Sequence, residues 1–283
     1  MPVSYYPGCS LEGTAREYGE STLDIARVLG IELKELSDWS CCGASSGHIT
    51  DDSLALALAA RNLGIADTVG LDLVVPCAAC YSRLKTAEKR LRSGRAIVGI
   101  PDTYQGNYRI MHLSQFLWED IGEETIRQHV KHPLDGLSPV CYYGCLITRP
   151  PDVTGAVDPD NPESIDNIMT ALGADVRRWS YKTDCCGASH MLTLPQVAIP
   201  MIQKLLDMAE EAGADSIVVG CPMCYTSLDS MQETISQETG HEYDTPIFFI
   251  TEMMGLAFGE PVDKHLGRHS VDPRPLLSQK GLL

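Results

Sequence analysis

Eleven cysteines are the residues of this 283-residue chain whose type and spacing could do chemistry. Ten of them form two sets of the same order: a single cysteine, an adjacent pair, and a C-x-x-C motif. Thiolates are soft metal ligands, and structural disulfides are rare in a reducing compartment. We therefore expect metal or redox chemistry from the two sets, which are Cys9, Cys41, Cys42, Cys77 and Cys80, and Cys145, Cys185, Cys186, Cys221 and Cys224.

The two sets belong to an internal repeat. CCGAS occurs at 41–45 and again at 185–189, and in both places 34 residues separate the adjacent pair from C-x-x-C. The likeness extends beyond cysteine, because HLSQFL (112–117) corresponds to FITEMMGL (249–256). A repeat of this length indicates one supersecondary unit used twice. We predict two cysteine-rich domains, residues 1–135 and 136–283.

Short apolar runs alternate with helical patterns in each half. VSYYPGC, LDLVVP, VCYYGC and SIVVG are typical of buried strands, whereas 14–29, 54–70 and 200–213 have helical character. The segments after both C-x-x-C motifs also have a helical pattern. This alternation predicts an α/β fold of two pseudo-symmetric, Rossmann-like domains with mainly parallel sheets, one CCG motif in each. The Pro- and Asp-rich segment 146–163 is expected to be a long loop.

The cysteines fall where strands are expected to give way to helices. Such positions lie at the carboxyl edge of a parallel sheet, where binding sites form. A helix N-terminus there stabilises a thiolate and lowers its pKa. This placement is predicted for Cys9, Cys77, Cys80, Cys145, Cys221 and Cys224.

Five cysteines are more ligands than the common protein metal centres use. Zinc takes four ligands in a closed site, and a cubane iron–sulfur cluster also takes four. Adjacent cysteines cannot easily chelate one ion, but they can reach two metals or bridge a pair. The sets therefore favour a multinuclear iron–sulfur centre, with zinc as the first alternative and thiol redox work as the second.

The pattern CCG-x33-C-x2-C, written twice, resembles the cysteine-rich CCG-domain family, and within it the B subunit of heterodisulfide reductase. AARNLGIAD (59–67) and DPDNPESIDNIMTALGA (158–174) belong to the resemblance, which covers nearly the whole chain. It implies that each set of five binds one noncubane [4Fe-4S] cluster. It also implies that a disulfide is split between the clusters, next to Cys41, Cys42, Cys185 and Cys186, with electrons from a ferredoxin-like C subunit and a flavin-containing A subunit. In a methanogen the substrate would be the coenzyme M–coenzyme B heterodisulfide.

Other residues near the motifs have weaker signals. His190 follows the second CCGAS directly and could donate a proton to a leaving thiolate, so it joins the catalytic candidates. His48 is interpreted as an ordinary loop histidine. Cys141 lies outside the repeat and is expected to be a buried free thiol. Tyr81 and Tyr225 are expected to pack over the clusters.

Charge and hydropathy limit the partners. The net charge of −16 argues against nucleic acid or an anionic membrane surface as the main ligand. Apolar runs are too short to insert into a bilayer, and the first residues lack signal-peptide character, which predicts a cytoplasmic protein. Two rival functions stay open: an electron-transfer or anchor subunit of a flavin-dependent succinate, lactate or glycolate dehydrogenase, and a zinc-stapled structural subunit.

Overall fold

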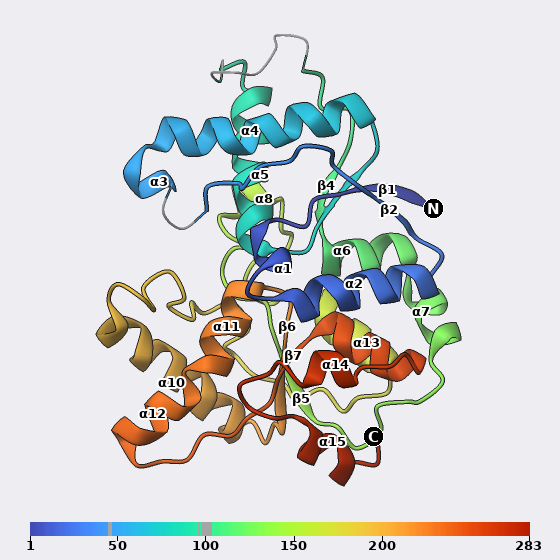
Figure 1. The fold of residues 1–283 in the computed structure, drawn as a ribbon, viewed down its shortest axis with the longest axis vertical. Coiled ribbons are helices and arrows are strands. Elements are labelled where there is room, and N and C mark those ends of the chain that lie inside the picture. Colours follow the sequence, from blue (N-terminus) through green and yellow to red (C-terminus); the bar gives the residue numbers. More distant parts are fainter. Residues whose placement is uncertain (45–46, 96, 98–103) are drawn as a thin grey trace.

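Two small parallel sheets form the scaffold of the computed structural model (Figure 1), which describes residues 1–44, 47–95, 97 and 104–283. The first sheet has the strand order β2-β1-β3-β4 and the second the order β5-β6-β7, and neighbouring strands are parallel in both. The predicted α/β architecture of two repeated units is therefore confirmed. The strands are β1 (Pro2–Tyr5), β2 (Glu32–Glu35), β3 (Leu73–Val75), β4 (Ile110–His112), β5 (Pro139–Tyr142), β6 (Ser216–Val219) and β7 (Ile247–Phe249).

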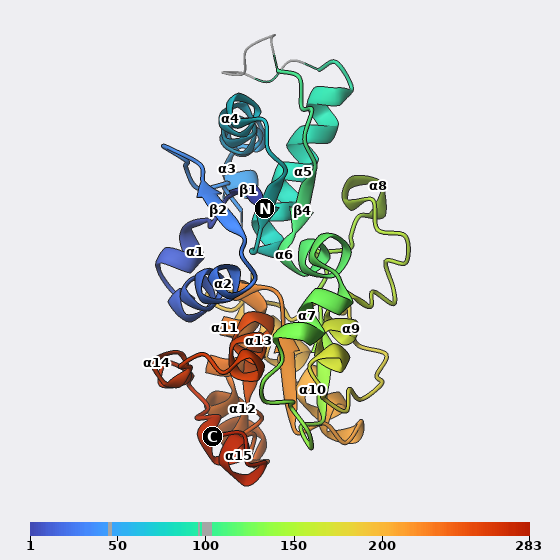
Figure 2. The same ribbon diagram turned by 90° about the vertical axis from the view of Figure 1, so that its right-hand side faces the viewer.

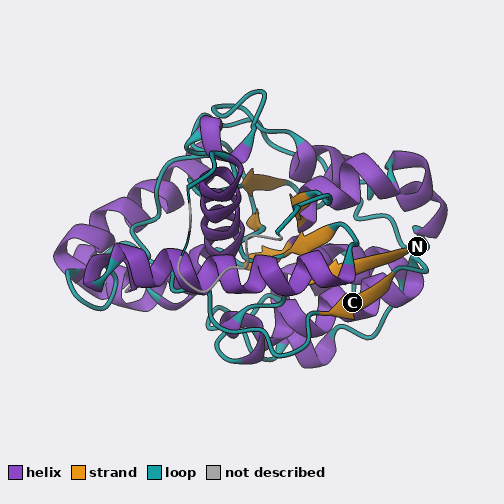
Figure 3. Cartoon of the chain, turned by 90° about the horizontal axis from the view of Figure 1, so that it is seen from above, coloured by secondary structure: helices purple, strands orange, loops and turns teal. Residues whose placement is uncertain are grey.

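Helices surround the strands, as the view from above makes plain (Figure 3). The first unit carries α1 (Cys9–Glu12), α2 (Arg16–Val28), α3 (Gly47–Thr50), α4 (Asp52–Val69), α5 (Ala78–Arg92), α6 (Leu113–Phe116), the π-helix η1 (Leu117–Ile121) and α7 (Glu123–His129). The second carries α8 (Pro151–Thr154), α9 (Ser164–Ala171), α10 (Pro195–Glu211), α11 (Pro222–Ser230), α12 (Gln232–Thr239), α13 (Ile250–Phe258), α14 (Asp263–Leu266) and α15 (Arg274–Gln279).

The local sequence explains where the longest helix begins and ends. The Asp51 carboxylate accepts hydrogen bonds from the backbone N–H groups of Ser53 and Leu54, which caps α4. The helix ends at Gly70, whose φ of 69° is left-handed and favours glycine. The helix predicted over 54–70 is thus confirmed with its start two residues earlier.

The repeat is less regular in structure than in sequence. Residues 175–177 occupy the place of β2 beside β5, with only the hydrogen bonds Asp175 N to Leu137 O (2.9 Å) and Arg177 N to Pro139 O (2.8 Å). The segment 146–163 is a loop as predicted, except that α8 forms one helical turn in it. The helix predicted over 200–213 begins earlier, at Pro195, because proline suits the first turn of a helix. The boundary between 1–135 and 136–283 stays a prediction.

The two units exchange helix contacts across a pseudo-twofold arrangement. Helix α2 of the first unit packs on α13 of the second, while α9 of the second packs on α6 and η1 of the first. Both contacts lie in the middle of the molecule (Figures 1 and 2). The insertion that carries α8 also packs on α5, which adds a further contact between the second unit and the first.

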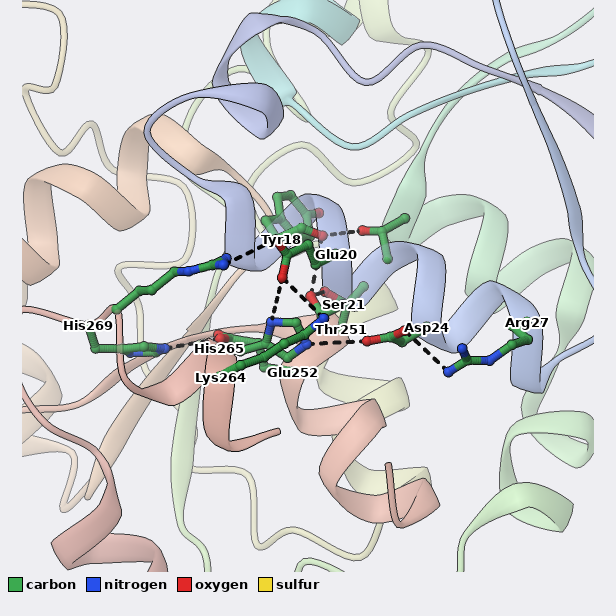
Figure 4. A network of polar contacts seen from close by, with 12 residues as sticks. Tyr18, Glu20, Ser21, Asp24, Arg27, Thr251, Glu252, Lys264, His265 and His269 are labelled. Carbon is green, nitrogen blue, oxygen red and sulfur yellow. Dashed lines mark hydrogen bonds and ion pairs between the residues drawn. The ribbon is translucent and has the colours of Figure 1, made fainter. Parts of the chain in front are cut away.

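Polar contacts fix α2 against the C-terminal third of the chain (Figure 4). The hydroxyls of Ser21 and Thr251 form a buried hydrogen bond of 2.6 Å. Farther out on α2, Glu20 pairs with Lys264 at 3.2 Å and with Arg268 at 3.1 Å. The buried hydrogen bond contributes most per contact, because exposed ion pairs are screened by solvent.

A fully buried ion pair lies behind this interface. His269 Nε2 and Glu252 Oε1 are 3.0 Å apart, and both side chains are inaccessible to solvent. Glu252 also accepts a hydrogen bond from the backbone N–H of Phe249, at the start of α13. Burial alone would lower the pKa of His269, but the Glu252 carboxylate outweighs it and raises that pKa. The pair's contribution to stability is therefore complete below the usual histidine pKa and is lost as the pH rises through the raised value.

Replacing Glu252 by alanine should lower the free energy of unfolding by about 3 kcal/mol, because it leaves a buried imidazolium without its partner. Urea unfolding under anaerobic conditions measures this loss. Glu123→Ala is the matched control: it removes the exposed pair with Arg127 and should cost less than about 0.5 kcal/mol. Equal effects of the two variants would contradict the importance of the buried pair.

Candidate metal centre

The carboxyl ends of the two sheets face each other, and the cysteines gather there. Cys77 and Cys221 stand at the N-caps of α5 and α11, directly after the residues that follow β3 and β6. Cys80 and Cys224 lie one turn into these helices. The predicted placement is therefore confirmed for the C-x-x-C cysteines, and also for Cys9, which begins α1.

For Cys145 the predicted placement is wrong. It follows β5, but the chain then continues through turns until α8 begins at Pro151. The Pro-rich insertion has no continuous run able to form the helix that Cys9 begins in the first unit. Cys145 thus lacks the helix N-terminus that its counterpart has.

Burial follows the same order in both sets. The first cysteine of each adjacent pair is exposed, the second is buried, and both C-x-x-C cysteines are buried. The single cysteines differ, since Cys9 is exposed and Cys145 is half-buried. Each set thus presents sulfurs both to the interior and to the surface.

The sulfur atoms come together in pairs. In the first unit, Cys9 Sγ lies 3.7 Å from Cys41 Sγ, and Cys42 Sγ lies 3.3 Å from Cys80 Sγ. In the second, Cys186 Sγ lies 3.6 Å from Cys224 Sγ. In the described part of the chain, no three His, Cys, Asp or Glu side chains converge as ligands of one metal ion do.

Hydrogen bonds within each set separate thiols from thiolates. Hydrogen bonding with Cys41 and with Cys80 lowers the pKa of Cys42 to about 3, and the charge of Arg83 adds to this. The same contacts raise the pKa values of Cys41 and Cys80. Sulfurs in this state are ready to bind a cation, because the thiolate is the metal-binding form.

Hydrogen bonds also lower cysteine pKa values in the second set. The hydrogen bond with Cys145 lowers the pKa of Cys185 to about 6, helped by the Gly187 N–H, 3.4 Å from the sulfur, and by the charge of His190. The hydrogen bond with Cys224 lowers the pKa of Cys186 to about 7. Both adjacent pairs therefore contain a thiolate near neutral pH.

A glycine makes room for a sulfur at equivalent places in the two units. A Cβ on Gly8 would lie 2.8 Å from Cys80 Sγ, and a Cβ on Gly144 would lie 2.8 Å from Cys224 Sγ. Both glycines have a left-handed φ, +73° and +65°. The Gly-Cys sequences therefore bring the backbone against the last cysteine of each set, which a side chain would prevent.

His112 joins the two sets. Its Nε2 lies 2.9 Å from the carbonyl oxygens of both Pro76 and Gly220, the residues immediately before the two C-x-x-C motifs. Carbonyls only accept, so Nε2 carries the proton, while Nδ1 accepts from the backbone N–H of Ser114 at 3.2 Å. Burial lowers the pKa of His112 to about 4, so the ring is neutral.

Tyr18 lies beside this bridge. Its hydroxyl is 3.4 Å from the same two carbonyl oxygens, and its ring stacks on Phe249 at 4.2 Å. Phe249 caps α13 at the position where His112 caps α6. The sequence alone did not point to His112, Tyr18 or Arg83; the correspondence of HLSQFL with FITEMMGL marked the His112 position but gave no role to it.

The remaining candidates take different places. His190 is exposed in the turn after the second CCG motif, where its backbone N–H bonds to Gly187 O at 2.8 Å. The interpretation of His48 as a loop histidine is wrong, because the residue belongs to the short helix α3. Ser45 of the first CCGAS lies outside the described residues. Cys141 is buried in β5, as expected, and burial raises its pKa far above the usual value. Tyr81 donates to Thr154 O at 3.1 Å, and Tyr225 stacks on Phe249. That both pack over clusters stays a prediction.

A cavity of about 380 Å³ opens next to the cysteines. Residues of both units line it: Ser10, Thr14 and Ile49 from the first, and Ala188, Ser189, Met191, Leu192, Thr193, Pro222, Met223 and Thr226 from the second. Ser10 follows Cys9, and Pro222 and Met223 lie between Cys221 and Cys224. The lining therefore includes direct chain neighbours of cysteines from both units.

The chain belongs to the cysteine-rich (CCG) domain family, whose model matches residues 3–85 and 140–229. One match lies in each unit of the fold. The recognition of this family from the repeated motif is confirmed, and the motif is doubled because the family domain occurs twice in the chain.

Named relatives cover almost the whole chain. The 8-methylmenaquinol:fumarate reductase membrane anchor subunit of Wolinella succinogenes is 32% identical over 275 residues, 95% of this chain and 96% of that protein. A protein of Archaeoglobus profundus, named as like the B subunit of heterodisulfide reductase, is 28% identical, over 92% of this chain and 91% of that protein. The B subunit of a ferredoxin/F(420)H(2)-dependent CoB-CoM heterodisulfide reductase of Methanosarcina acetivorans is 26% identical, over 93% and 91%.

The fold has a solved counterpart. A hypothetical protein from Helicobacter pylori superposes with a TM-score of 0.76 and 14% sequence identity, covering 96% of this chain and 52% of that one. This likeness concerns the fold alone. It shows that the two units take the same relative placement in an experimentally determined structure.

Gly144→Ala should destabilise the second unit by about 1 to 3 kcal/mol more than Gly155→Ala. Both glycines have a left-handed φ, so both variants bear the same backbone strain, but only a Cβ at Gly144 meets a sulfur, whereas nothing lies within 4 Å of one at Gly155. Urea unfolding of the two variants gives the difference. Equal losses would show that the contact with Cys224 is unimportant.

Proposed function

We propose that each set of five cysteines holds one noncubane [4Fe-4S] cluster. Cys9, Cys41, Cys42, Cys77 and Cys80 would bind the first, and Cys145, Cys185, Cys186, Cys221 and Cys224 the second. The donor sets suit such a group, because each combines five soft sulfurs with a thiolate in the adjacent pair and a glycine pressed against the last sulfur. Zinc in one of the sites is the alternative for the metal.

The chain's own residues would shape these sites. The backbone N–H of Gly187 donates to Cys185 Sγ, and such bonds tune the potential of a cluster. His112 holds the two C-x-x-C motifs at a fixed separation through the carbonyls before them. When bound, iron–sulfur clusters supply electrons one at a time.

We infer that the reaction is the reduction of a disulfide to two thiols, which consumes two electrons and two protons. The observation that carries this proposal is the cavity beside both cysteine sets, since a substrate with two sulfurs needs one electron-supplying site on each side. His190, exposed next to Cys185, is the candidate proton donor. The coenzyme M–coenzyme B heterodisulfide is the substrate that relatives' names mention.

The electrons would come from partner subunits. Relatives named as the B subunit of a heterodisulfide reductase support a complex with a ferredoxin-like C subunit and a flavin-containing A subunit. We place the complex in the cytoplasm. Among the described residues, no helix has the length and apolar character needed to span a bilayer.

A second function has its own support. The 32% identical relative is named a membrane anchor subunit of an 8-methylmenaquinol:fumarate reductase. In that case the two clusters would pass electrons between a quinol and a flavin subunit, and no disulfide would enter the cavity. The cysteine sites would be the same, so the substrate decides between the two functions.

Anaerobically purified protein should contain about eight iron atoms per chain, four for each cluster. Cys186→Ala should lose about half of this iron together with disulfide reduction, because it removes a buried ligand of one set. Cys141→Ala is the matched control, since Cys141 is equally buried but lies outside both sets. Iron analysis and absorption spectra measure the result. Two zinc atoms without iron would refute the iron–sulfur proposal.

Substrate turnover separates the two functions. Iron-loaded protein supplied with reduced methyl viologen should convert disulfides to thiols, measured as thiol release. It should not raise the rate at which menaquinone analogues are reduced above the rate without protein. The reverse outcome, quinone reduction without thiol release, would favour the anchor function. Either result is independent of the metal content, which iron analysis measures separately.

A further inference from the structure

Apolar surface predominates in the cavity beside the cysteines, although the hydroxyl residues Ser10, Thr14, Ser189, Thr193 and Thr226 also line it. Ile49, Met191, Leu192 and Met223 contribute large apolar side chains, and Ala188 and Pro222 add smaller apolar surfaces. The hydroxyl of Thr226 already donates to Pro222 O at 2.9 Å. A site of this composition binds its ligand by burying hydrocarbon.

The apolar surface continues out of the cavity at its rim. The side chains of Leu192 and Ile49 are 89% and 78% exposed, although both line the cavity. They come from different units, the first from the turn after the second CCG motif and the second from α3. Large exposed apolar side chains that converge on one opening mark a place where apolar surface is buried on binding.

The charge of the cavity lining and of the whole chain also favours a ligand without negative charge. The eleven lining residues within the described part of the chain are all uncharged, and the whole chain carries a net charge of −16. A sulfonate or phosphate in this cavity would give up its water without an ion-pair partner, which is costly. The surrounding negative charge would repel it further.

We propose that the cavity takes a neutral disulfide with at least one apolar arm, in preference to an anionic one such as the coenzyme M–coenzyme B heterodisulfide in the relatives' names. This inference rests on the proposed disulfide reduction and names its substrate class. In the reaction the S–S bond breaks, each sulfur gains one electron and one proton, and two neutral thiols leave. The electrons come from a one-electron donor, which in the assay is reduced methyl viologen.

The test compares two disulfides with the same carbon skeleton, dipropyl disulfide and bis(sulfopropyl) disulfide. Iron-replete protein should show a kcat/KM at least about tenfold higher for the neutral compound, which corresponds to a modest difference in burial free energy. Thiol release under anaerobic conditions measures both. An equal or higher value for the sulfonate would overturn the inference while leaving disulfide reduction intact.

Leu192→Lys should reverse part of this preference. It places a cation at the rim of the cavity and should raise kcat/KM for the sulfonate about fivefold. Val197→Lys is the matched control: Val197 is also apolar and exposed in the second unit, but it is outside the lining, so the preference should stay as in the parent protein. The same shift in both variants would show that net charge, not the cavity, sets the preference.

Failure of the proposed function would give a different experimental result from failure of this inference about the substrate class. If iron-replete protein releases thiols from neither compound, disulfide reduction is refuted and the substrate class falls with it. If menaquinone analogues are reduced instead, and Leu192→Lys slows that reaction, the apolar cavity serves a quinone.

Discussion

One buried imidazole holds the two halves of the molecule at a fixed distance. His112 donates a single N–H to the carbonyls of Pro76 and Gly220, each the last residue before a C-x-x-C motif. Those carbonyls lie at the carboxyl ends of β3 and β6, where water cannot reach them, so each needs a donor from the protein. The low pKa of His112 keeps the ring neutral, which avoids burying an unpaired charge between two thiolate-rich sets.

The rest of the interface maintains this contact. Helix α2 is tied to α13, and α9 to α6 and η1, so that each unit is clamped by a helix of the other. The stacked rings of Tyr18 and Phe249 fill the space on the other side of the bridge. Phe249 stands where His112 stands in the first unit, so the second unit supplies an apolar ring at this position. The further donor to the two carbonyls is the hydroxyl of Tyr18, at 3.4 Å from each oxygen.

The cysteine chemistry could be predicted from sequence because it is carried by residue type and spacing. The repeat of CCG and C-x-x-C predicted the two units, the parallel sheets and the placement of Cys77 and Cys221. The prediction for Cys145 failed, since a proline-rich insertion changes the segment after a strand without changing the motif. His112 could not be assigned a role, because its partner Gly220 is 108 residues away in the chain and the contact exists only after both units have folded and docked. The buried pair of Glu252 and His269 joins residues 17 positions apart in the second unit, a contact that no motif in the sequence marks.

Two nearly equal cysteine sets do not make an evenly shared site. Among the residues that the structure describes, eight of those that line the cavity come from the second unit, and three, Ser10, Thr14 and Ile49, come from the first. The charges near the adjacent pairs differ as well, with Arg83 acting on Cys42 and His190 on Cys185. A substrate in this cavity would therefore meet two unlike neighbours, so the pseudo-symmetry of the scaffold does not require the two halves of the substrate to be alike.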